Sequence, residues 1–250
     1  MCDQLLRQSL RGGVEVDPDL GSMLDRADEL LVQLEQECEL CLRSEGVSLR
    51  ARNIAHEVLD KLRSSLDQAM RRAWHRHMAP YLSEDEKRKA RVYFPVSSDL
   101  DSFESTLGRG CMTELATCNP ELYQFLLEKQ PFASEDNGWL RVVSKLAAEG
   151  KHERLVPQKR METRRITLTG PRGGSISWPS SGVKFGRGVS FAGAPIDPLT
   201  QRIVPTPGVT ERIDTLVAFI IEGYDVNAVG FCRNACSRTR QLLEEMADWL

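Results

Sequence analysis

The fold is decided by residues 48–78, which read SLRARNIAHEVLDKLRSSLDQAMRRAWHRHM. Apolar residues recur in this stretch every three or four positions, which is the spacing of one buried helix face. Ser48 precedes the first turn, and serine is a common capping residue at helix N-termini. The stretch therefore predicts a long amphipathic helix that begins after Ser48 and ends near Met78. Its expected buried face consists of Ile54, Ala55, Val58, Leu59, Leu62, Leu66, Ala69, Met70, Ala73 and Trp74.

Apolar residues with the same period predict another long helix from Leu20 to Leu42. Gly46 follows its end, and the short connection should place the two long helices antiparallel. Shorter helices are expected downstream, at 84–91 after a capping box of Ser83 and Glu86, at 99–107, at 111–117, from Pro120 to Lys129 and at 140–148.

Beyond Pro157 the sequence becomes rich in proline and glycine, and short β-like runs alternate with turns. We expect a small antiparallel sheet with strands at 164–168, 175–178, 183–191, 202–204 and 213–221. A final helix is expected from Asp225 to Leu250, packed back against the first two. The predicted fold class is therefore α+β, with an N-terminal antiparallel helical bundle, a small antiparallel sheet and a long C-terminal helix.

These changes in composition and apolar spacing along the sequence predict that the chain has three parts. Residues 1–17 should form a flexible tail, and residues 18–157 should form the helical bundle. Residues 158–250 should hold the sheet and the C-terminal helix, in one compact unit with the bundle.

The charge of the whole chain is nearly balanced, because 33 Lys or Arg residues stand against 36 Asp or Glu residues, for a net charge of −3. This balance excludes a protein that coats nucleic acid over its whole surface, but it permits a local basic patch. The longest apolar stretch, 216–221, is far shorter than the roughly 20 residues of a membrane-spanning helix, and the N-terminus lacks a signal-peptide pattern. With an odd count of seven cysteines, these features predict a cytoplasmic protein without a membrane partner.

Two cysteine pairs, Cys38 with Cys41 and Cys232 with Cys236, are candidates for a zinc site, because four thiolates suit tetrahedral coordination. Both pairs lie inside predicted helices, on or beside the apolar face, where cysteine is a common small core residue. We therefore expect core packing and no metal, while the sequence leaves metal binding by these pairs open. No cofactor is expected, since the glycine-rich segments lack the Gly-Lys-Ser/Thr ending of a phosphate loop.

A polar ridge runs beside the apolar face of the helix at 48–78. Its members are spaced four, three and four residues apart and are His56, Asp60, Arg63 and Asp67. Opposite charges along such a ridge can form intrahelical ion pairs, which is the structural interpretation. A partly buried cluster of Arg, Asp and His can also bind phosphate, which is the functional interpretation. The spacing alone favours the structural one.

A further polar cluster, Lys151-His152-Glu153-Arg154, follows the helix expected at 140–148. Cations at a helix exit complement the helix dipole and are usually solvated. Lys151 and His152 could also complement carboxylates such as Asp67 across the bundle. The cluster therefore has both a structural and a functional interpretation.

Four short motifs occur in a fixed order, namely Leu62-Arg-Ser-Ser-Leu-Asp67, Phe94-Pro95, Gln130-Pro131-Phe132 and Lys151-His152-Glu-Arg154. This order resembles a widespread family of uncharacterised bacterial proteins with Leu-Arg-Ser-Ala-Leu-Asp-His, Phe-Pro, Gln-Pro-Phe/Tyr and Asp-Lys-His-Arg motifs. The resemblance spans about residues 50–157. In that family the Arg-x4-His pattern is similar to the signature of HEPN domains, helical bundles of which many are metal-independent ribonucleases in defence and toxin systems.

The resemblance implies roles for individual residues. The HEPN histidine acts in acid–base catalysis on the 2′-hydroxyl, and the arginine stabilises phosphate charge. Arg63 and Asp67 match the motif, whereas Gln68 occupies the histidine position and cannot transfer a proton at neutral pH. In an active enzyme the acid–base group would therefore be His56 or His152, and Gln68 argues against activity.

The same resemblance makes Lys151 and Arg154 candidate phosphate- or RNA-binding residues, and Arg52, in the helix segment that holds the polar ridge, is a further candidate. We expect a HEPN-like protein that acts on or binds RNA or a nucleotide in a bacterial or phage defence system, with an active or a degenerate site. The alternative is a non-enzymatic interaction or structural module that dimerises through its long helices, in which the charged residues form only a structural lock. The expected partner is RNA or a nucleotide in the first case, and a second copy or another protein in the second.

Overall fold

The computed structural model describes residues 17–41, 47–150 and 158–250. As the sequence predicts, the chain combines helix and strand, with a helical N-terminal region, an antiparallel sheet and a C-terminal helix. The chain is divided into two compact units. The helical unit consists of Met1–Gln158 with Ile221–Leu250, and the β unit consists of Lys159–Ile220. The C-terminal helix belongs to the helical unit.

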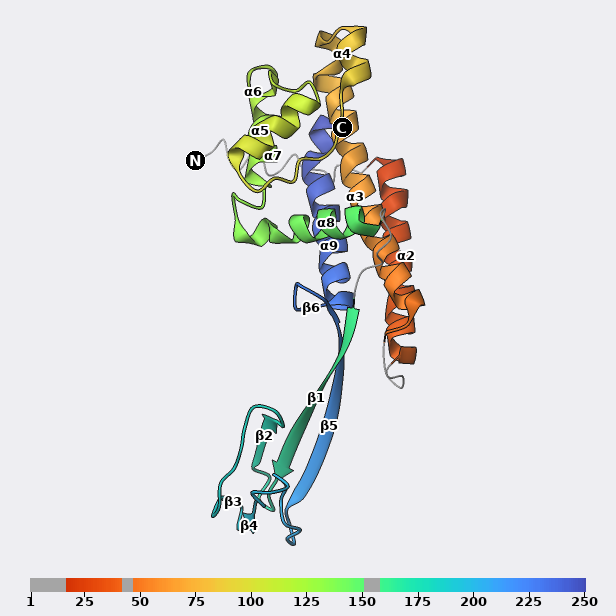
Figure 1. Cartoon of the computed structure of the whole chain (residues 1–250). Coiled ribbons are helices and arrows are strands. Elements are labelled where there is room, and N and C mark those ends of the chain that lie inside the picture. The colour runs from red at the N-terminus through yellow and green to blue at the C-terminus, as the bar shows by residue number, and fades with distance from the viewer. Residues whose placement is uncertain (1–16, 42–46, 151–157) are drawn as a thin grey trace, which may run out of the picture. The chain divides into compact units, whose positions relative to one another are not determined.

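Two long helices form an antiparallel pair in the helical unit (Figure 1), and they are α2 (Pro18–Cys41) and α3 (Leu49–His77). Near the end of α3, Arg72 Nη2 donates to Asp19 Oδ2 at the start of α2, at 2.9 Å. At the opposite end of the pair, Ser48 Oγ donates to Glu37 Oε1 at 2.7 Å. The start of each helix therefore lies beside the end of the other, which confirms the antiparallel prediction.

The apolar face of α3 forms the centre of the helical core. Ser48 caps this helix, because its side chain accepts the backbone N–H of Ala51 at 3.0 Å. Every residue of the predicted buried face is buried, and burial of each large apolar side chain stabilises the fold by about 1.5–3 kcal/mol. The buried residues of α3 are Ala51, Ile54, Ala55, Val58, Leu59, Leu62, Ser65, Leu66, Ala69, Met70, Ala73 and Trp74.

The C-terminal helix, α9 (Ala228–Met246), packs against both α2 and α3, as predicted. Arg233 Nη2 lies 2.6 Å from Glu35 Oε1, and Arg240 Nη2 lies 2.8 Å from Asp28 Oδ2. The two helices run antiparallel, because the earlier residue of α9 meets the later residue of α2 and the later residue of α9 meets the earlier one. Exposed pairs of this kind contribute little stability, but they fix the register between the helices.

The start of α9 differs from the prediction, which placed it at Asp225. That residue has a left-handed backbone with φ of 50°, and a two-residue strand, β6 (Val226–Asn227), follows it. Asn227 then caps the helix, because its Oδ1 accepts the N–H of Gly230 at 2.8 Å. Asp and Asn both favour turns and helix caps, so the sequence alone did not separate the turn residue from the cap.

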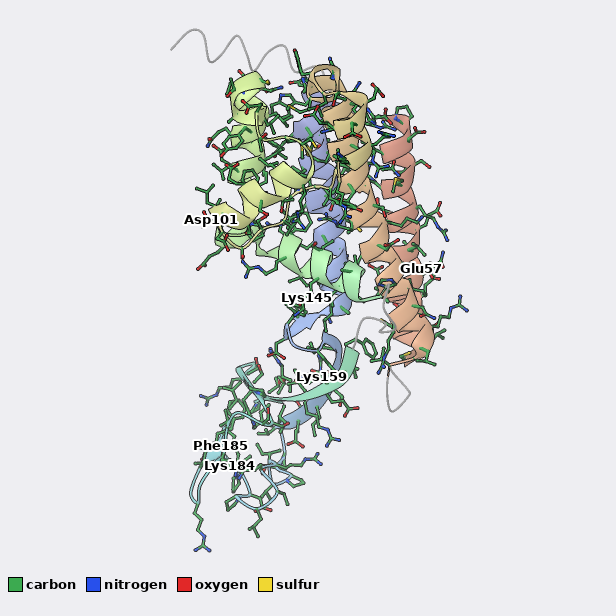
Figure 2. The ribbon with its side chains drawn as sticks, turned by 45° about the horizontal axis from the view of Figure 1, so that its top comes forward. Glu57, Asp101, Lys145, Lys159, Lys184 and Phe185 are labelled. Atoms are coloured by element: carbon green, nitrogen blue, oxygen red, sulfur yellow. The ribbon has the colours of Figure 1, made fainter. Side chains whose placement is uncertain are left out.

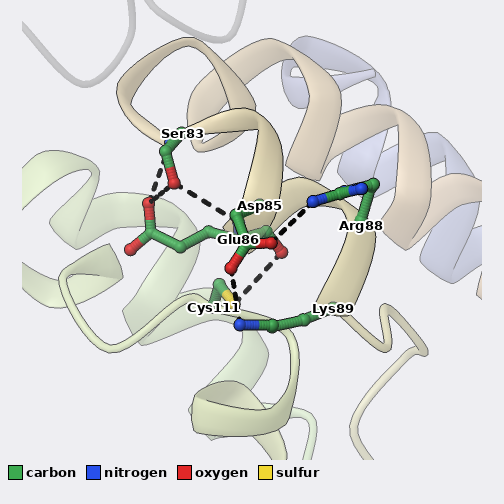
Figure 3. Close-up of polar contacts among 6 residues, drawn as sticks. All are labelled: Ser83, Asp85, Glu86, Arg88, Lys89 and Cys111. Atoms are coloured by element: carbon green, nitrogen blue, oxygen red, sulfur yellow. Dashed lines mark hydrogen bonds and ion pairs between the residues drawn. The ribbon is translucent and has the colours of Figure 1, made fainter.

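Short helices occupy the chain between α3 and the β unit, and they are η1 (Ala79–Tyr81), α4 (Glu84–Lys89), α5 (Leu100–Arg109), α6 (Leu115–Cys118), α7 (Pro120–Glu128), η2 (Glu135–Asn137) and α8 (Gly138–Gly150). The predicted capping box of Ser83 and Glu86 is confirmed on α4. Figure 3 shows it beside the ion pairs that Asp85 forms with two basic residues of the same helix. No helix in the described ranges has both the length and the apolar character that crossing a membrane requires.

Helix α8 crosses α3 in the helical unit (Figure 1), and its buried face includes Leu140, Val143 and Leu146. An irregular stretch between α4 and α5, residues 91–97, contains the buried Phe94 and is called the connecting segment below. At its first residue, the Arg91 N–H donates to the carbonyl oxygen of Arg109, at 2.8 Å. This bond joins the connecting segment to the end of α5.

The strands of the β unit belong to two antiparallel sheets. The larger sheet has the strand order β2-β1-β5-β6, and β3 pairs with β4 in a separate two-stranded sheet. The strands are β1 (Gln158–Thr169), β2 (Ser175–Pro179), β3 (Ser190–Phe191), β4 (Ala194–Pro195) and β5 (Thr210–Ile221). Ile166 on β1 lies opposite Trp178 on β2. Both side chains join Leu168 and Ile196 in a small buried cluster. One face of the β1–β2 pair therefore packs on the rest of the β unit.

Two of the predicted strands are largely wrong. Within 183–191 only the last two residues form a strand, and Gly188 has φ of 86°, a left-handed conformation that interrupts an extended chain. The expected strand at 202–204 contributes only an isolated bridge between Ile203 and Ile196. Turns between glycines and prolines thus replace the pairing that the apolar residues suggested.

Candidate functional site

Arg63 and Asp67, one turn apart on α3, hold the backbone of Phe94 in the connecting segment. Arg63 Nη2 donates to the Phe94 carbonyl oxygen at 2.9 Å, and the Phe94 N–H donates to Asp67 Oδ1 at 2.9 Å. The two side chains also pair, with 2.7 Å between Arg63 Nη2 and Asp67 Oδ1, and are only 15% and 21% exposed. Charge-assisted bonds therefore replace water around both groups and fix the connecting segment against α3.

Gln130 holds the following residues of the connecting segment. Its side chain is fully buried, and its Oε1 accepts the N–H of Ser97 at 3.0 Å. Its Nε2 donates to the carbonyl oxygens of Pro95 and Leu126, at 3.1 and 2.8 Å. Both ends of the amide are thus used, as buried polar groups require. Three of the four motifs noted in the sequence therefore meet at the connecting segment.

A cavity of about 400 Å³ adjoins the connecting segment and is called the arginine cavity. Its lining includes Arg63, Arg91, Tyr93, Thr106, Arg109 and Ser144, which come from α3, the connecting segment, α5 and α8. Three guanidinium groups contribute to this lining, and no carboxylate side chain from the described ranges does. A concave surface with such an excess of positive charge favours an anionic occupant.

The three arginines of the cavity are held in different ways. Arg63 uses Nη2 and Nε in the bonds to Phe94 and Asp67, while its buried Nη1 has no hydrogen-bond partner among the described residues. Arg109 Nη2 donates to Thr106 Oγ1 at 2.9 Å. Arg91 and Arg109 are exposed, and neither forms an ion pair within the described part of the chain. Both guanidinium groups therefore keep donors for a ligand.

The geometry of the cavity suits a phosphate-bearing ligand. Guanidinium groups bind phosphate oxygens through two parallel N–H donors, and the Ser144 hydroxyl adds a neutral donor at the same cavity. Tyr93, two residues after Arg91, also lines the cavity, and half of its surface is exposed. An exposed aromatic ring beside arginines can stack on a nucleobase.

Two predicted site residues of α3 lie away from the lining of the arginine cavity. His56 precedes Arg63 by seven residues, which is about 10 Å along the helix axis. It is half-buried, and its Nδ1 is buried without a hydrogen-bond partner among the described residues. Arg52 is half-buried one turn further toward the start of the helix. Within the predicted polar ridge, the ion pair that the described structure contains is Arg63 with Asp67.

The remaining predicted site residues, Lys151, His152 and Arg154, lie outside the described residues. The roles of His152 as an acid–base group and of Lys151 and Arg154 as phosphate-binding residues therefore stay predictions. Gln68, at the histidine position of the HEPN-like motif, is exposed on α3 and does not line the arginine cavity.

His77 at the basic end of α3 lies between two fixed partners. Its Nε2 is 3.2 Å from the carbonyl oxygen of Trp249, and its Nδ1 is 3.3 Å from Asn119 Nδ2. Because Asn119 Oδ1 accepts the N–H of Leu122, the amide must present its NH2 group to the imidazole. The neutral ring with a proton on Nε2 satisfies both contacts. Burial lowers the pKa of His77, and the charge of Arg76 lowers it further, while the Trp249 bond opposes them.

The cysteines of the two predicted pairs are buried in the helical core. Burial raises the pKa of Cys38 and of Cys236 to about 12, and it also raises the pKa of Cys232. Burial thus favours the neutral thiol over the thiolate at Cys38, Cys232 and Cys236. The described ranges contain no group of three or more His, Cys, Asp or Glu side chains arranged to hold a metal ion. Their burial agrees with the core-packing interpretation.

Sequence reasoning missed Arg91 and Arg109, which supply most of the free charge of the arginine cavity. Arg91 follows α4 and Arg109 ends α5, and a charged residue at the end of a short helix is usually only solvated. They meet because the Trp74 Nε1–H donates to the Gly110 carbonyl oxygen at 2.8 Å, which fixes the end of α5 on α3. In the sequence, the signal that points to this role is the position of Arg91 three residues before Phe94 of the Phe-Pro motif.

Comparisons of this chain with protein-family models, with curated proteins and with solved structures find no match. The resemblance to HEPN-like proteins therefore rests on the four motifs alone.

Proposed function

We propose that the helical unit binds the phosphate of an RNA or a nucleotide in the arginine cavity. The observation that carries this proposal is the lining itself, in which Arg63, Arg91 and Arg109 contribute three guanidinium groups and, among the described residues, no carboxylate takes part. Anions bound in such a site replace water as hydrogen-bond acceptors for the arginines. A volume of about 400 Å³ falls in the range of small-molecule sites.

Two further features favour a nucleotide over a free inorganic anion. Tyr93 is half exposed at the cavity and offers a ring on which a base can stack. The motif resemblance to HEPN-like proteins favours RNA as the source of the phosphate, and a bacterial or phage defence system as the setting. In this proposal the Arg63 and Asp67 side chains position the connecting segment, while Arg91 and Arg109 contact the ligand.

Binding is better supported than cleavage. Breaking an RNA phosphodiester at its 2′-hydroxyl needs an acid–base group close to the phosphate. Within the described ranges the cavity lining includes no histidine, and His56 lies about two helical turns from Arg63. Cleavage would therefore need His152 to reach the cavity. We accordingly propose a degenerate site that binds without cutting.

Calorimetric titration with AMP, pyrophosphate and a trinucleotide RNA tests the proposal. AMP and the trinucleotide should bind the wild type, and the double variant Arg91→Gln/Arg109→Gln should lose at least about tenfold in affinity, since each charge-assisted bond contributes roughly 1.5–3 kcal/mol. The matched control is Arg26→Gln/Arg233→Gln, which removes two exposed arginines of the helical unit that form ion pairs elsewhere. Equal affinity of the double variant and the wild type would refute the proposed site.

A cleavage assay separates the two forms of the proposal. A 30-nucleotide RNA incubated with the protein should remain intact under the conditions in which it binds. Cleavage that disappears in His152→Ala would replace the binding-only site with an enzyme. Cleavage that survives both His152→Ala and Arg63→Ala would point to a contaminating nuclease.

A protein interface is the second candidate function, and one observation favours it. Leu40 and Leu49 are 73% and 68% exposed, at the end of the α2–α3 pair where Ser48 bonds to Glu37. Two large apolar side chains at one end of a helix pair are typical of a contact surface. Light scattering of the wild type and of Leu40→Ser/Leu49→Ser tests this, because a dimer through these helices should become a monomer in the variant.

A further inference from the structure

The β unit differs from the rest of the chain in its charge. Residues 159–220 contain nine Lys or Arg residues and four Asp or Glu residues, for a formal net charge of +5. Since the whole chain carries −3, the other residues together carry −8. A unit of this size with such an excess of cations attracts polyanions, although the whole chain is acidic.

Most cations of the β unit have no ion-pair partner among its described carboxylates. Glu211 pairs with Arg202, and Asp214 pairs with Arg212. Asp197 stabilises a turn, since its side chain accepts the N–H of Leu199 and the hydroxyl of Thr200. Five exposed cations then have no carboxylate partner within the described part of the chain, and they are Arg164, Arg165, Arg172, Lys184 and Arg187.

The outer face of the β1–β2 pair carries hydrogen-bonding groups beside these cations. Thr167 lies opposite Ser177, and Thr169 lies opposite Ser175. Side chains alternate between the faces of a strand, so these hydroxyls lie on the face opposite the buried cluster of Ile166, Leu168 and Trp178. Arg165 shares this outer face at one end, and the turn that contains Arg172 follows at the other, a length of about 13 Å. Arg165 and Arg172 thus border a row of hydroxyl groups.

The aromatic rings of the β unit are engaged with each other. Trp178 is buried and meets Phe185 edge to face, with 4.9 Å between ring centroids. Figure 2 labels Phe185 next to Lys184, in the loop that follows β2. Sequence-specific recognition of unpaired bases needs exposed rings for stacking. Contacts through cations and hydroxyls therefore favour the phosphate backbone as the ligand, without selection for base sequence.

We infer that the β unit binds the phosphate backbone of nucleic acid through its exposed unpaired cations, among which Arg165 and Arg172 lie beside the hydroxyl groups of β1 and β2. The inference is independent of the arginine cavity, which belongs to the helical unit. Four to five lysine and arginine contacts would make the affinity strongly dependent on salt. With four phosphates neutralised on a single strand, the affinity should fall about 50-fold between 50 and 200 mM salt.

Fluorescence anisotropy of the full chain with a labelled 20-nucleotide RNA, and with a DNA of the same sequence, tests the inference. The variant Arg165→Gln/Arg172→Gln/Lys184→Gln/Arg187→Gln should bind at least tenfold more weakly, with a shallower dependence on salt. The matched control, Arg26→Gln/Arg88→Gln/Lys89→Gln/Arg233→Gln, removes the same number of exposed cations from the helical unit and should bind like the wild type. Circular dichroism of each variant checks that the fold is retained.

Three outcomes would overturn the inference. One is an affinity of the β-unit variant within twofold of the wild type, and another is an equal loss in the control. The last is tighter binding to vesicles with anionic lipid than to RNA or DNA, which would assign the surface to membranes. AMP binding reports on the arginine cavity alone, so loss of RNA binding with retained AMP binding separates the two sites.

Discussion

Replacement of Asp67 by Ala tests how firmly the connecting segment is held. Asp67 Oδ1 accepts the Phe94 N–H at 2.9 Å, and such a bond to a charged acceptor contributes about 1.5–3 kcal/mol. The change also removes the carboxylate that pairs with Arg63, whose side chain is only 15% exposed. Together we expect a loss of roughly 3 kcal/mol in the free energy of unfolding. The melting temperature should then fall by about 6–12 °C.

Thermal melting followed by circular dichroism, with a urea titration in parallel, measures this change. The matched control is Asp85→Ala on α4, where the carboxylate is exposed and pairs with Arg88 and Lys89. That control should shift the melting temperature by less than about 2 °C, because exposed ion pairs contribute little. Asp67→Asn should lie between the two, since an amide oxygen can accept the N–H but cannot neutralise Arg63. A melting temperature of Asp67→Ala equal to that of Asp85→Ala would refute the claim that Asp67 stabilises the connecting segment on α3.

Two further predictions follow from buried polar contacts. Gln130→Leu leaves a buried N–H and two carbonyl oxygens without their partner, so we expect a loss of about 2–4 kcal/mol in the free energy of unfolding. Urea titration measures this loss. A urea midpoint of the variant equal to that of the wild type would contradict the prediction. The lowered pKa of His77 means that the unfolded chain binds its proton first as pH falls, so stability is highest above the unfolded pKa of about 6.5 and decreases below it. The wild type should melt at a lower temperature at pH 5.5 than at pH 7.5, and His77→Gln should reduce this difference; an unchanged pH dependence in the variant would assign it to other groups.

Local sequence signals predicted the helices well because each signal acts within one or two turns. Ser48 and the apolar period of α3 fixed both ends and the buried face of that helix. The capping box of Ser83 with Glu86 and the position of Pro120 fixed the starts of α4 and α7. The strands were predicted less well, since a run such as 183–191 looks extended in sequence while Gly188 turns the chain.

The candidate site shows the same division between local and distant information. The pairing of Arg63 with Asp67 follows from their spacing of four residues on one helix. Their bonds to the Phe94 backbone involve a partner about thirty residues away, and no periodicity in the sequence encodes it. The contributions of Arg91 and Arg109 to the cavity depend on how α5 is fixed to α3 through Trp74, which only the folded chain reveals.

A crystal structure of the protein soaked with AMP shows whether the arginine cavity holds a phosphate. We expect the phosphate to lie in the arginine cavity, within hydrogen-bond distance of the Arg91 and Arg109 guanidinium groups, with the base against Tyr93. The buried Nη1 of Arg63, which has no partner among the described residues, is the third expected donor. An empty cavity at an AMP concentration that saturates binding in solution, or a nucleotide bound elsewhere on the molecule, would refute phosphate binding by these arginines.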